Sequence, residues 1–230
     1  MKKTYLLRSA VLTAFLIFSH IIASAYYFQV DGIYYNITST TDLTVEVTYK
    51  TTSYNSYSGD VTIPETVTYN SITYTVTGIG GYAFRKCTSL TSITIPDAVE
   101  SIGDYAFYNC SSLPSITIPD AVTTIGSYAF LNCTQLTSLT IPVTASFTTY
   151  KDSRSKCPFE NTVLTDLTIT GKGDMMDNAF YNFTALENVT LSEGITSIGE
   201  SAFYGCISLT SITIPEAVTS IGDYAFYNCI

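Results

Sequence analysis

Thiols, carboxylates and tyrosine hydroxyls are the side chains that could do chemistry in this sequence. The 230 residues include six cysteines and 19 acidic residues, but the single histidine is His20 and there is no tryptophan. If residues 1–25 are removed, as argued below, no imidazole remains. This excludes Ser-His-Asp and Cys-His catalysis, histidine-ligated zinc and histidine-based pH switching. The chemistry left open is that of carboxylate pairs and of thiols.

Five of the six cysteines recur at one equivalent position. Thr162 and Phe183 stand at that position in two further units, and replacement by phenylalanine indicates an apolar, buried site. The recurring cysteines include a run of three, which cannot pair completely within itself. We therefore predict buried thiols rather than disulfides, although an exported protein permits both. Cys157 lies outside this register and is predicted to be exposed. The recurring cysteines are Cys87, Cys110, Cys133, Cys206 and Cys229.

The carboxylates also recur at equivalent positions. A glycosidase needs a unique cleft that holds two acids. Repeated acids on a surface are typical of solvated turns, and the glycine-rich turns of calcium-binding β-helices are missing. The sequence therefore indicates no catalytic residue, no cofactor and no metal. The acids in question are Asp97, Asp120 and Glu216, with Asp104, Glu200 and Asp223.

The first 25 residues have the pattern of a secretory signal peptide. Lys2, Lys3 and Arg8 precede an apolar run over residues 10–18, and the segment ends in the small residues Ala23-Ser24-Ala25. The alternative is an uncleaved membrane anchor, for which nine apolar residues are short of the roughly 20 that a bilayer requires. We predict cleavage after Ala25, no later membrane span, and a secreted or cell-surface location.

The net charge bears on the partners. Cleavage after Ala25 removes three of the ten basic residues and none of the 19 acidic ones, so the formal net charge changes from −9 to −12. A chain this acidic repels phosphate backbones and anionic lipid surfaces. Nucleic acid is therefore not expected as a partner.

A 23-residue repeat organises the rest of the chain. The segment from Leu90 returns almost unchanged from Leu113, and again from Leu186 and Leu209. The repeated phenylalanine is spaced by 23, 23, 29, 21, 23 and 23 residues, which indicates about seven units with one disturbed unit at residues 136–163. Its occurrences are Phe84, Phe107, Phe130, Phe159, Phe180, Phe203 and Phe226. Repeats of this length stack to bury a common core.

Each unit should contain a short strand followed by a turn. Ile93 and Ile95 alternate with polar residues, which predicts a strand with one buried face, and Pro96 ends it. Gly103 is interpreted as permitting a sharp bend, and Asp104 to Cys110 as forming one or two helical turns. The predicted fold is an α/β leucine-rich repeat solenoid with short parallel strands.

The full unit resembles a known family. Its Ile-Pro-x-x-Val-x-x-Ile-Gly-x-x-Ala-Phe-x-x-Cys core, as at residues 95–110, is similar to the BspA-like leucine-rich repeats of bacterial secreted and cell-surface proteins. The resemblance covers about residues 59–230. It implies a non-enzymatic, protein-binding module that adheres to host or neighbouring-cell proteins. A structural spacer in a larger surface protein and, more weakly, a carboxylate-dependent glycan-acting enzyme are the alternatives.

The two ends differ from the repeat. Residues 26–58 are predicted to form a β-rich N-terminal cap, with one hairpin turning at Asp31-Gly32 and another around Asn70-Ser71 in the first unit. The sequence stops after a full-strength repeat with no capping unit. We expect either a fragment of a longer gene product or self-association through this end.

Two surfaces are candidates for partner binding. The first is an outward strand position that is threonine in every complete unit: Thr94, Thr117, Thr140, Thr168, Thr190 and Thr213. The second is the insertion in the disturbed unit, with Tyr150, Lys151, Arg154 and Lys156. The alternatives remain that threonine favours strands and that insertions are tolerated without function.

Overall fold

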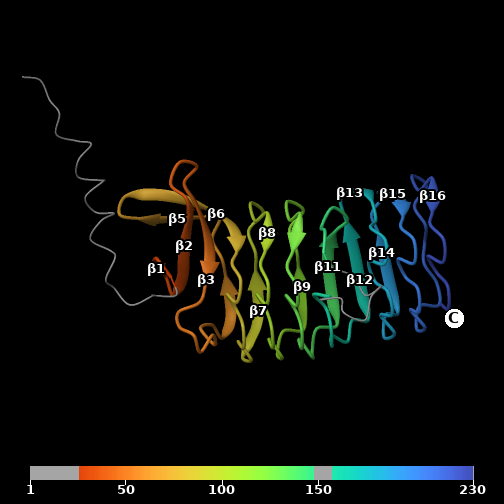
Figure 1. The fold of residues 1–230 in the computed structure, drawn as a ribbon, viewed down its shortest axis with the longest axis horizontal. Helices are drawn as coiled ribbons and strands as arrows, with labels where there is room; N and C mark the ends of the chain where they lie inside the picture. Colours follow the sequence, from red (N-terminus) through yellow and green to blue (C-terminus); the bar gives the residue numbers. More distant parts are fainter. Residues whose placement is uncertain (1–25, 148–156, 230) are drawn as a thin grey trace, which may run out of the picture.

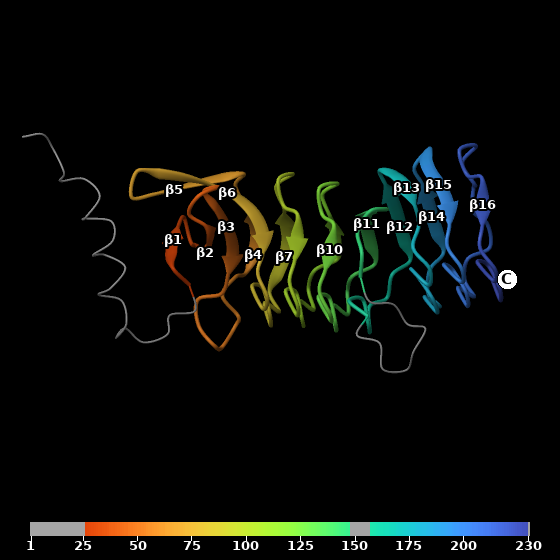
Figure 2. The ribbon, with the colours of Figure 1, turned by 45° about the horizontal axis from the view of Figure 1, so that its top comes forward.

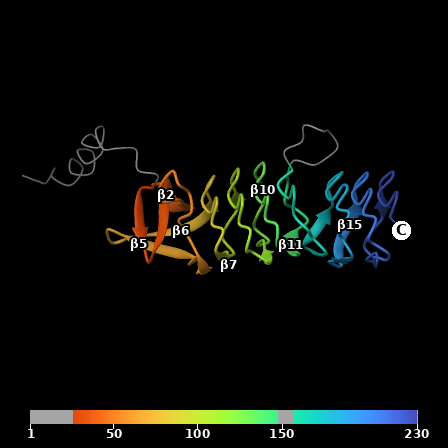
Figure 3. The same ribbon diagram turned by 90° about the horizontal axis from the view of Figure 1, so that it is seen from below.

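The computed structural model describes residues 26–147 and 157–229. Within them the chain forms strands and turns only, so the α in the predicted α/β class is wrong. The strands and turns build a stack of coils along one long axis, as Figure 1 shows and as Figure 3 shows from below. The predicted signal peptide (residues 1–25) and Tyr150, Lys151, Arg154 and Lys156 lie outside the described residues.

Each coil has three sides: a front segment, a back segment and a turn segment that contains the repeated phenylalanine. The front and back segments form strands, except that the front segment of coil 7 is not a strand and the back segment of coil 4 makes only a bridge at Ser146. We number the coils by that residue, so that coils 1 to 7 contain Phe84, Phe107, Phe130, Phe159, Phe180, Phe203 and Phe226.

The front strands pair in parallel in two sheets. The first pairs β4 (Gly59–Thr62) with β7 (Leu90–Thr94). The second contains β9 (Ser115–Thr117), β11 (Ser138–Pro142), β12 (Asp166–Thr170) and β14 (Asn188–Leu191). Isoleucine and leucine side chains of these strands point inward, as the period of two predicts.

The back strands also fall into two groups. The first joins β6 (Ile72–Ile79), β8 (Ser101–Ile102) and β10 (Thr124–Ile125), and Thr124 bridges on to Ser146. The second joins β13 (Lys172–Asp174), β15 (Gly194–Ile198) and β16 (Ser220–Ile221). The change from one group to the other falls between coils 4 and 5.

Both predicted hairpins are present at the N-terminal end. β1 (Phe28–Val30) and β2 (Ile33–Ser39) turn at Asp31 and Gly32, which both have positive φ. β3 (Thr44–Thr48) continues this sheet and pairs in parallel with β6, so that the sheet runs on into the back strands. The second hairpin joins β5 (Thr66–Tyr69) to β6, and it projects from the stack in Figure 2.

The predicted helical turns at Asp104 to Cys110 are wrong, for a reason that lies in the backbone hydrogen bonds. Tyr108 N donates to the carbonyl three residues earlier, as a turn does, but Phe107 N and Asn109 N donate to the next coil. Alternate N–H groups thus donate to a different coil, and Tyr105 and Asn109 have left-handed φ values. A helix needs consecutive internal bonds and right-handed residues.

Gly103 is required for a reason other than the predicted bend. Its φ is not left-handed, but a Cβ on it would lie 2.5 Å from the backbone nitrogen of Gly81 in the coil before. Gly126 is in the same situation, with a Cβ 2.4 Å from Asp104 N. The glycine therefore lets neighbouring coils approach at this corner.

The core is a column of stacked phenylalanine rings. Phe107 lies between Phe84 and Phe130 with centroid distances of 5.0 Å to each, and all three side chains are fully buried. Phe130 stacks on Phe159 at 5.2 Å. Tyr57, from the segment before coil 1, extends the column and lies 4.5 Å from Phe84. The predicted stacking of the repeated phenylalanine is confirmed within coils 1 to 4 and within coils 5 to 7, where Phe203 lies 5.8 Å from Phe180 and 5.5 Å from Phe226. It is interrupted between Phe159 and Phe180, where Phe147 contacts both rings.

Candidate functional site

The first candidate surface is the outer face of the four-stranded front sheet, which we call the threonine face. Thr117, Thr140, Thr168 and Thr190 occupy directly paired positions on β9, β11, β12 and β14. A second in-register row, Ser115, Ser138, Asp166 and Asn188, runs beside it. The face therefore displays two rows of short polar side chains, one coil apart at each step.

Two of the six predicted threonines lie outside this sheet. Thr94 is exposed on β7 and pairs with Thr62, and β7 does not pair with β9. Pro114 explains the interruption, because it has no N–H at the position where Thr137 and Thr165 donate to the preceding coil. Thr213 is exposed in a segment of coil 7 that has no strand partner.

Asp166 is the one residue of these two rows that has a carboxylate. Its Oδ1 accepts a hydrogen bond from Asn188 Nδ2 at 2.8 Å, and its Oδ2 accepts one from Thr165 Oγ1 at 2.6 Å. The Thr165 hydroxyl and then the Asn188 amide lower the pKa of Asp166, because they stabilise the charged form. The carboxylate is exposed, so it remains available to a partner.

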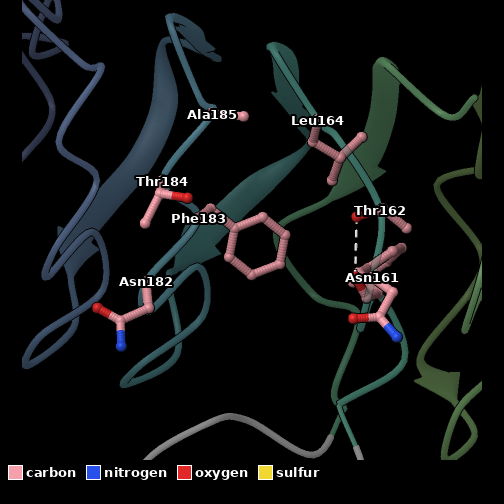
Figure 4. Close-up of a pocket in the computed structure, with 8 residues that line it drawn as sticks. Asn161, Thr162, Leu164, Asn182, Phe183, Thr184 and Ala185 are labelled. Atoms are coloured by element: carbon pink, nitrogen blue, oxygen red, sulfur yellow. Dashed lines mark hydrogen bonds between the residues drawn. The ribbon is translucent and has the colours of Figure 1, made fainter. Parts of the chain in front are cut away.

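A second feature is a hollow between coils 4 and 5 on the turn side. It has a volume of about 270 Å³ and is lined by Phe159, Asn161, Thr162, Leu164, Asn182, Phe183, Thr184 and Ala185. Figure 4 shows the ring of Phe183 between the two coils, with the amide of Asn161 on one side and that of Asn182 on the other.

The hollow exists because the two coils do not bond to each other on this side. Phe130 N and Asn132 N donate to coil 4, and Phe180 N and Asn182 N donate to coil 6. Among the described residues, no backbone bond joins 157–161 to 177–181. Phe147 lies between the coils, edge-on to Phe159 and Phe180 at 5.7 and 6.2 Å. The insertion thus begins with a ring that separates the two coils.

The cysteines are free and all but one are fully buried. Burial raises the pKa of Cys87 to about 11 and that of Cys206 to about 12. The predicted burial of the recurring thiols is confirmed, with Cys229 only partly buried. The predicted exposure of Cys157 is wrong: it is buried, and burial raises its pKa to about 12. It occupies the position two residues before Phe159, where other coils have a tyrosine.

Arg85 is a partly buried residue whose surroundings the repeat pattern does not predict. Its guanidinium carbon lies 4.7 Å from the ring centroid of Tyr54, 5.4 Å from Tyr82 and 5.2 Å from Tyr108. These cation–π contacts leave the guanidinium group charged, and the electron-rich faces of the rings attract that charge. The available signal was its position, since Arg85 stands where coils 2, 5, 6 and 7 have tyrosine after the repeated phenylalanine.

Residues 26–147 and 157–229 contain no group of three or more His, Cys, Asp or Glu side chains placed to hold a metal ion. In the same ranges no helix is long and apolar enough to cross a membrane.

The family follows from the repeat and its geometry. The model for the BspA type leucine rich repeat region matches residues 64–175 and 173–230, with six copies where the phenylalanine spacing predicts about seven units. The chain belongs to this family of bacterial leucine-rich repeat proteins. No curated protein matches it.

Solved structures of bacterial proteins share the fold. A leucine-rich repeat protein from Bacteroides ovatus is 35% identical with a TM-score of 0.62, and the match covers 88% of this chain and 51% of that one. A leucine rich cell surface protein from Faecalibacterium prausnitzii is 30% identical with a TM-score of 0.52, over 88% and 52%. A leucine-rich repeat protein from Eubacterium ventriosum is 26% identical with a TM-score of 0.58, over 85% and 50%. The chain spans about half the length of these proteins.

Proposed function

We propose that this chain is an exported, non-enzymatic protein-binding module of the bacterial cell surface that adheres to host or neighbouring-cell proteins through the threonine face. One observation supports the proposal above the others: Thr117, Thr140, Thr168 and Thr190 are paired in register, with no bulky side chain in their row. Hydroxyls spaced by one strand separation can each donate and accept a hydrogen bond. An extended partner segment fits such a surface.

The relatives support the location. The Faecalibacterium prausnitzii protein is described as a cell surface protein, and the predicted signal peptide provides for export. Binding by many weak polar contacts depends on shape and on freedom from large side chains, so one long charged residue in the row should be enough to prevent it.

The test is binding of the purified chain to immobilised extracellular-matrix proteins, measured by surface plasmon resonance. Thr140→Arg places a long cation in the middle of the threonine face and should lower the affinity for a bound matrix protein at least tenfold. Thr219→Arg is the matched control, since Thr219 is exposed on the other side of coil 7. Equal loss in both variants, or none in either, contradicts the proposal. A panel without any binding favours the structural spacer.

A further inference from the structure

A second surface lies on the turn side of the stack, where some coils lack a tyrosine that the other coils have. The position two residues before the repeated phenylalanine is tyrosine in coils 1, 2, 3 and 7. In the first three coils these rings contact one another: Tyr82 and Tyr105 are stacked with centroids 5.4 Å apart, and Tyr105 and Tyr128 are tilted by 31° with centroids 5.2 Å apart. Coils 5 and 6 have Asn178 and Ser201 instead. Coil 4 has Cys157 there, so three rings of the row are missing, two of them in the neighbouring coils 5 and 6.

A hollow lies where the rings of coils 5 and 6 would stand. Its volume is about 390 Å³, and its lining consists of Asn178, Tyr181, Ser201, Tyr204, Tyr224 and Tyr227. None of these side chains is charged at neutral pH. Tyrosine, serine and asparagine are also the residues that dominate protein-binding loops of antibodies, because tyrosine gives contact area at low entropic cost and the small polar residues adapt their hydrogen bonds.

The side chain of Asn178 has a buried polar atom with no hydrogen-bond partner among the described residues. The residue is 5% exposed, and its Oδ1 is buried without a hydrogen bond. Its backbone is satisfied, since Asn178 N donates to Glu200 O at 2.8 Å. Asparagine suits the left-handed φ of 55° at this position, but the backbone does not require the amide to be buried and unpaired. Ser201 beside it is also left-handed and buried.

We propose that this hollow binds the side chain of a tyrosine presented by a partner polypeptide. The phenol ring would take the space of the missing repeat tyrosines, next to Tyr224. Its hydroxyl, which both donates and accepts, would bond to the amide of Asn178 once that side chain turns its buried Oδ1 toward the hollow. The chain itself shows that tyrosine rings fit this position, in coils 1 to 3. The inference deepens the proposed function, on which it rests, by naming the partner group that one surface recognises.

The arrangement of the wall favours an aromatic ring over a sugar. Tyr204 lies between Tyr181 and Tyr227 with centroid distances of 4.7 and 5.1 Å, and the rings are nearly parallel. Both faces of Tyr204 are thus covered and only its edge is free. A ring edge is positive and attracts the negative face of another aromatic ring, a face that a pyranose does not have.

The experiment uses a small probe, N-acetyl-tyrosinamide, and ligand-observed saturation-transfer NMR with the whole chain. We expect transfer to the phenol ring, at least threefold weaker transfer to the phenylalanine analogue, and none to methyl β-glucoside. Ser201→Tyr should fill the hollow with the chain's own ring and abolish the transfer. Asn178→Gly keeps the left-handed backbone and should remove the preference for tyrosine over phenylalanine. Ser101→Tyr, at an exposed serine of the back strand β8 in coil 2, is the control and should leave the transfer unchanged.

Several results would overturn the inference. These are no transfer with the unmodified chain, equal transfer in Ser201→Tyr and the unmodified chain, or stronger transfer to the glucoside. Circular dichroism and the thermal melt establish that each variant is folded, and tyrosine is already accommodated at the equivalent left-handed position of four coils. Because the probe does not use the threonine face, its binding and the matrix-protein binding of the proposed function can fail independently.

Discussion

The Sγ of Cys133 lies 3.1 Å from the carbonyl oxygen of Phe107, one coil earlier in the stack. Cys110 makes the same contact with Phe84, and Cys206 with Phe180, at 3.1 and 3.2 Å. The recurring cysteine is thus a buried donor to the neighbouring coil and needs no disulfide. Thr162 replaces it with a hydroxyl that bonds Phe159 O within its own coil, at the point where the turn side opens.

The thiols should therefore react slowly in the folded protein. At pH 8 we expect iodoacetamide to modify Cys229 first, because it is partly exposed, and Cys157 and Cys206 only after unfolding. Since burial raises the pKa values of Cys157 and Cys206 to about 12, raising the pH from 8 to 9 should leave their reaction slow. Mass spectrometry of the labelled peptides measures the order. Early labelling of Cys157 would contradict it.

The phenylalanine column should dominate stability. Phe107→Ala removes a fully buried ring that stacks on both sides, and we expect it to lower the free energy of unfolding by about 3–5 kcal/mol. Phe147→Ala is the comparison, because Phe147 is only partly buried and makes edge contacts. Its loss should cost less. Chemical denaturation of both variants measures the difference, and an equal cost would show that stacking on both sides adds nothing.

The close approach of two coils at Gly103 can be tested by comparing alanine substitutions at Gly103 and at Gly81. Gly103→Ala places a methyl group 2.5 Å from Gly81 N, where only backbone can move, and should cost about 1–3 kcal/mol. Gly81→Ala, where the nearest atom to the new methyl group is Asp104 O at 3.4 Å, should change stability by less than about 0.5 kcal/mol. The thermal melts of the two variants check this. Comparable melts would mean that the coils separate freely at this corner.

Asp166 should titrate below its ordinary pKa of 3.8, because Thr165 and Asn188 bond to its charged form. The stability it adds is present above pH 4 and is lost as the pH falls through the lowered pKa. Because the carboxylate is exposed, that contribution should stay below about 0.5 kcal/mol. Asn188→Ala should move the pKa back toward 3.8 in a carbon-13 NMR titration. An unchanged pKa would mean that the Asn188 contact is absent in solution.

The sequence alone predicts those features of the fold that the period of the repeat determines. The 23-residue spacing predicts the phenylalanine column, the alternation at Ile93 and Ile95 predicts the strand, and Asp31-Gly32 predicts a hairpin turn. All three are present, although Phe147 interrupts the column between coils 4 and 5. These features depend on residues within one unit or on its exact recurrence. The threonine rows follow from the same recurrence, although Pro114 breaks them between β7 and β9 and Thr213 lies in no strand.

Features that depend on the neighbouring coil were predicted wrongly or not at all. The predicted helix at Asp104 to Cys110 fails because Phe107 N bonds to the next coil, which no local propensity reports. Cys157 is predicted to be exposed because it lies outside the recurring cysteine position. It occupies the position of the repeated tyrosine instead, where its surroundings bury it. The hollow over Asn178 and Ser201 required knowing that the replaced tyrosines contact one another.

The opening between coils 4 and 5 should be visible in hydrogen exchange. Phe107 N and Asn109 N donate to Ala129 O and Leu131 O at 2.7 and 2.9 Å, but the equivalent amides of Phe159 and Asn161 have no partner among the described residues. Both residues line the hollow of about 270 Å³, which has room for water.

We therefore expect the amides of Phe159 and Asn161 to exchange at least about tenfold faster than those of Phe107 and Asn109. NMR-detected exchange in D₂O measures the four rates. The amide of Thr168 serves as the internal control, because β12 pairs on both sides and should stay protected if coil 5 remains folded. Fast exchange at Thr168 would indicate that coil 5 unfolds locally, and not that a permanent opening separates coils 4 and 5. Equal protection of all four amides would mean that the two coils close on each other in solution.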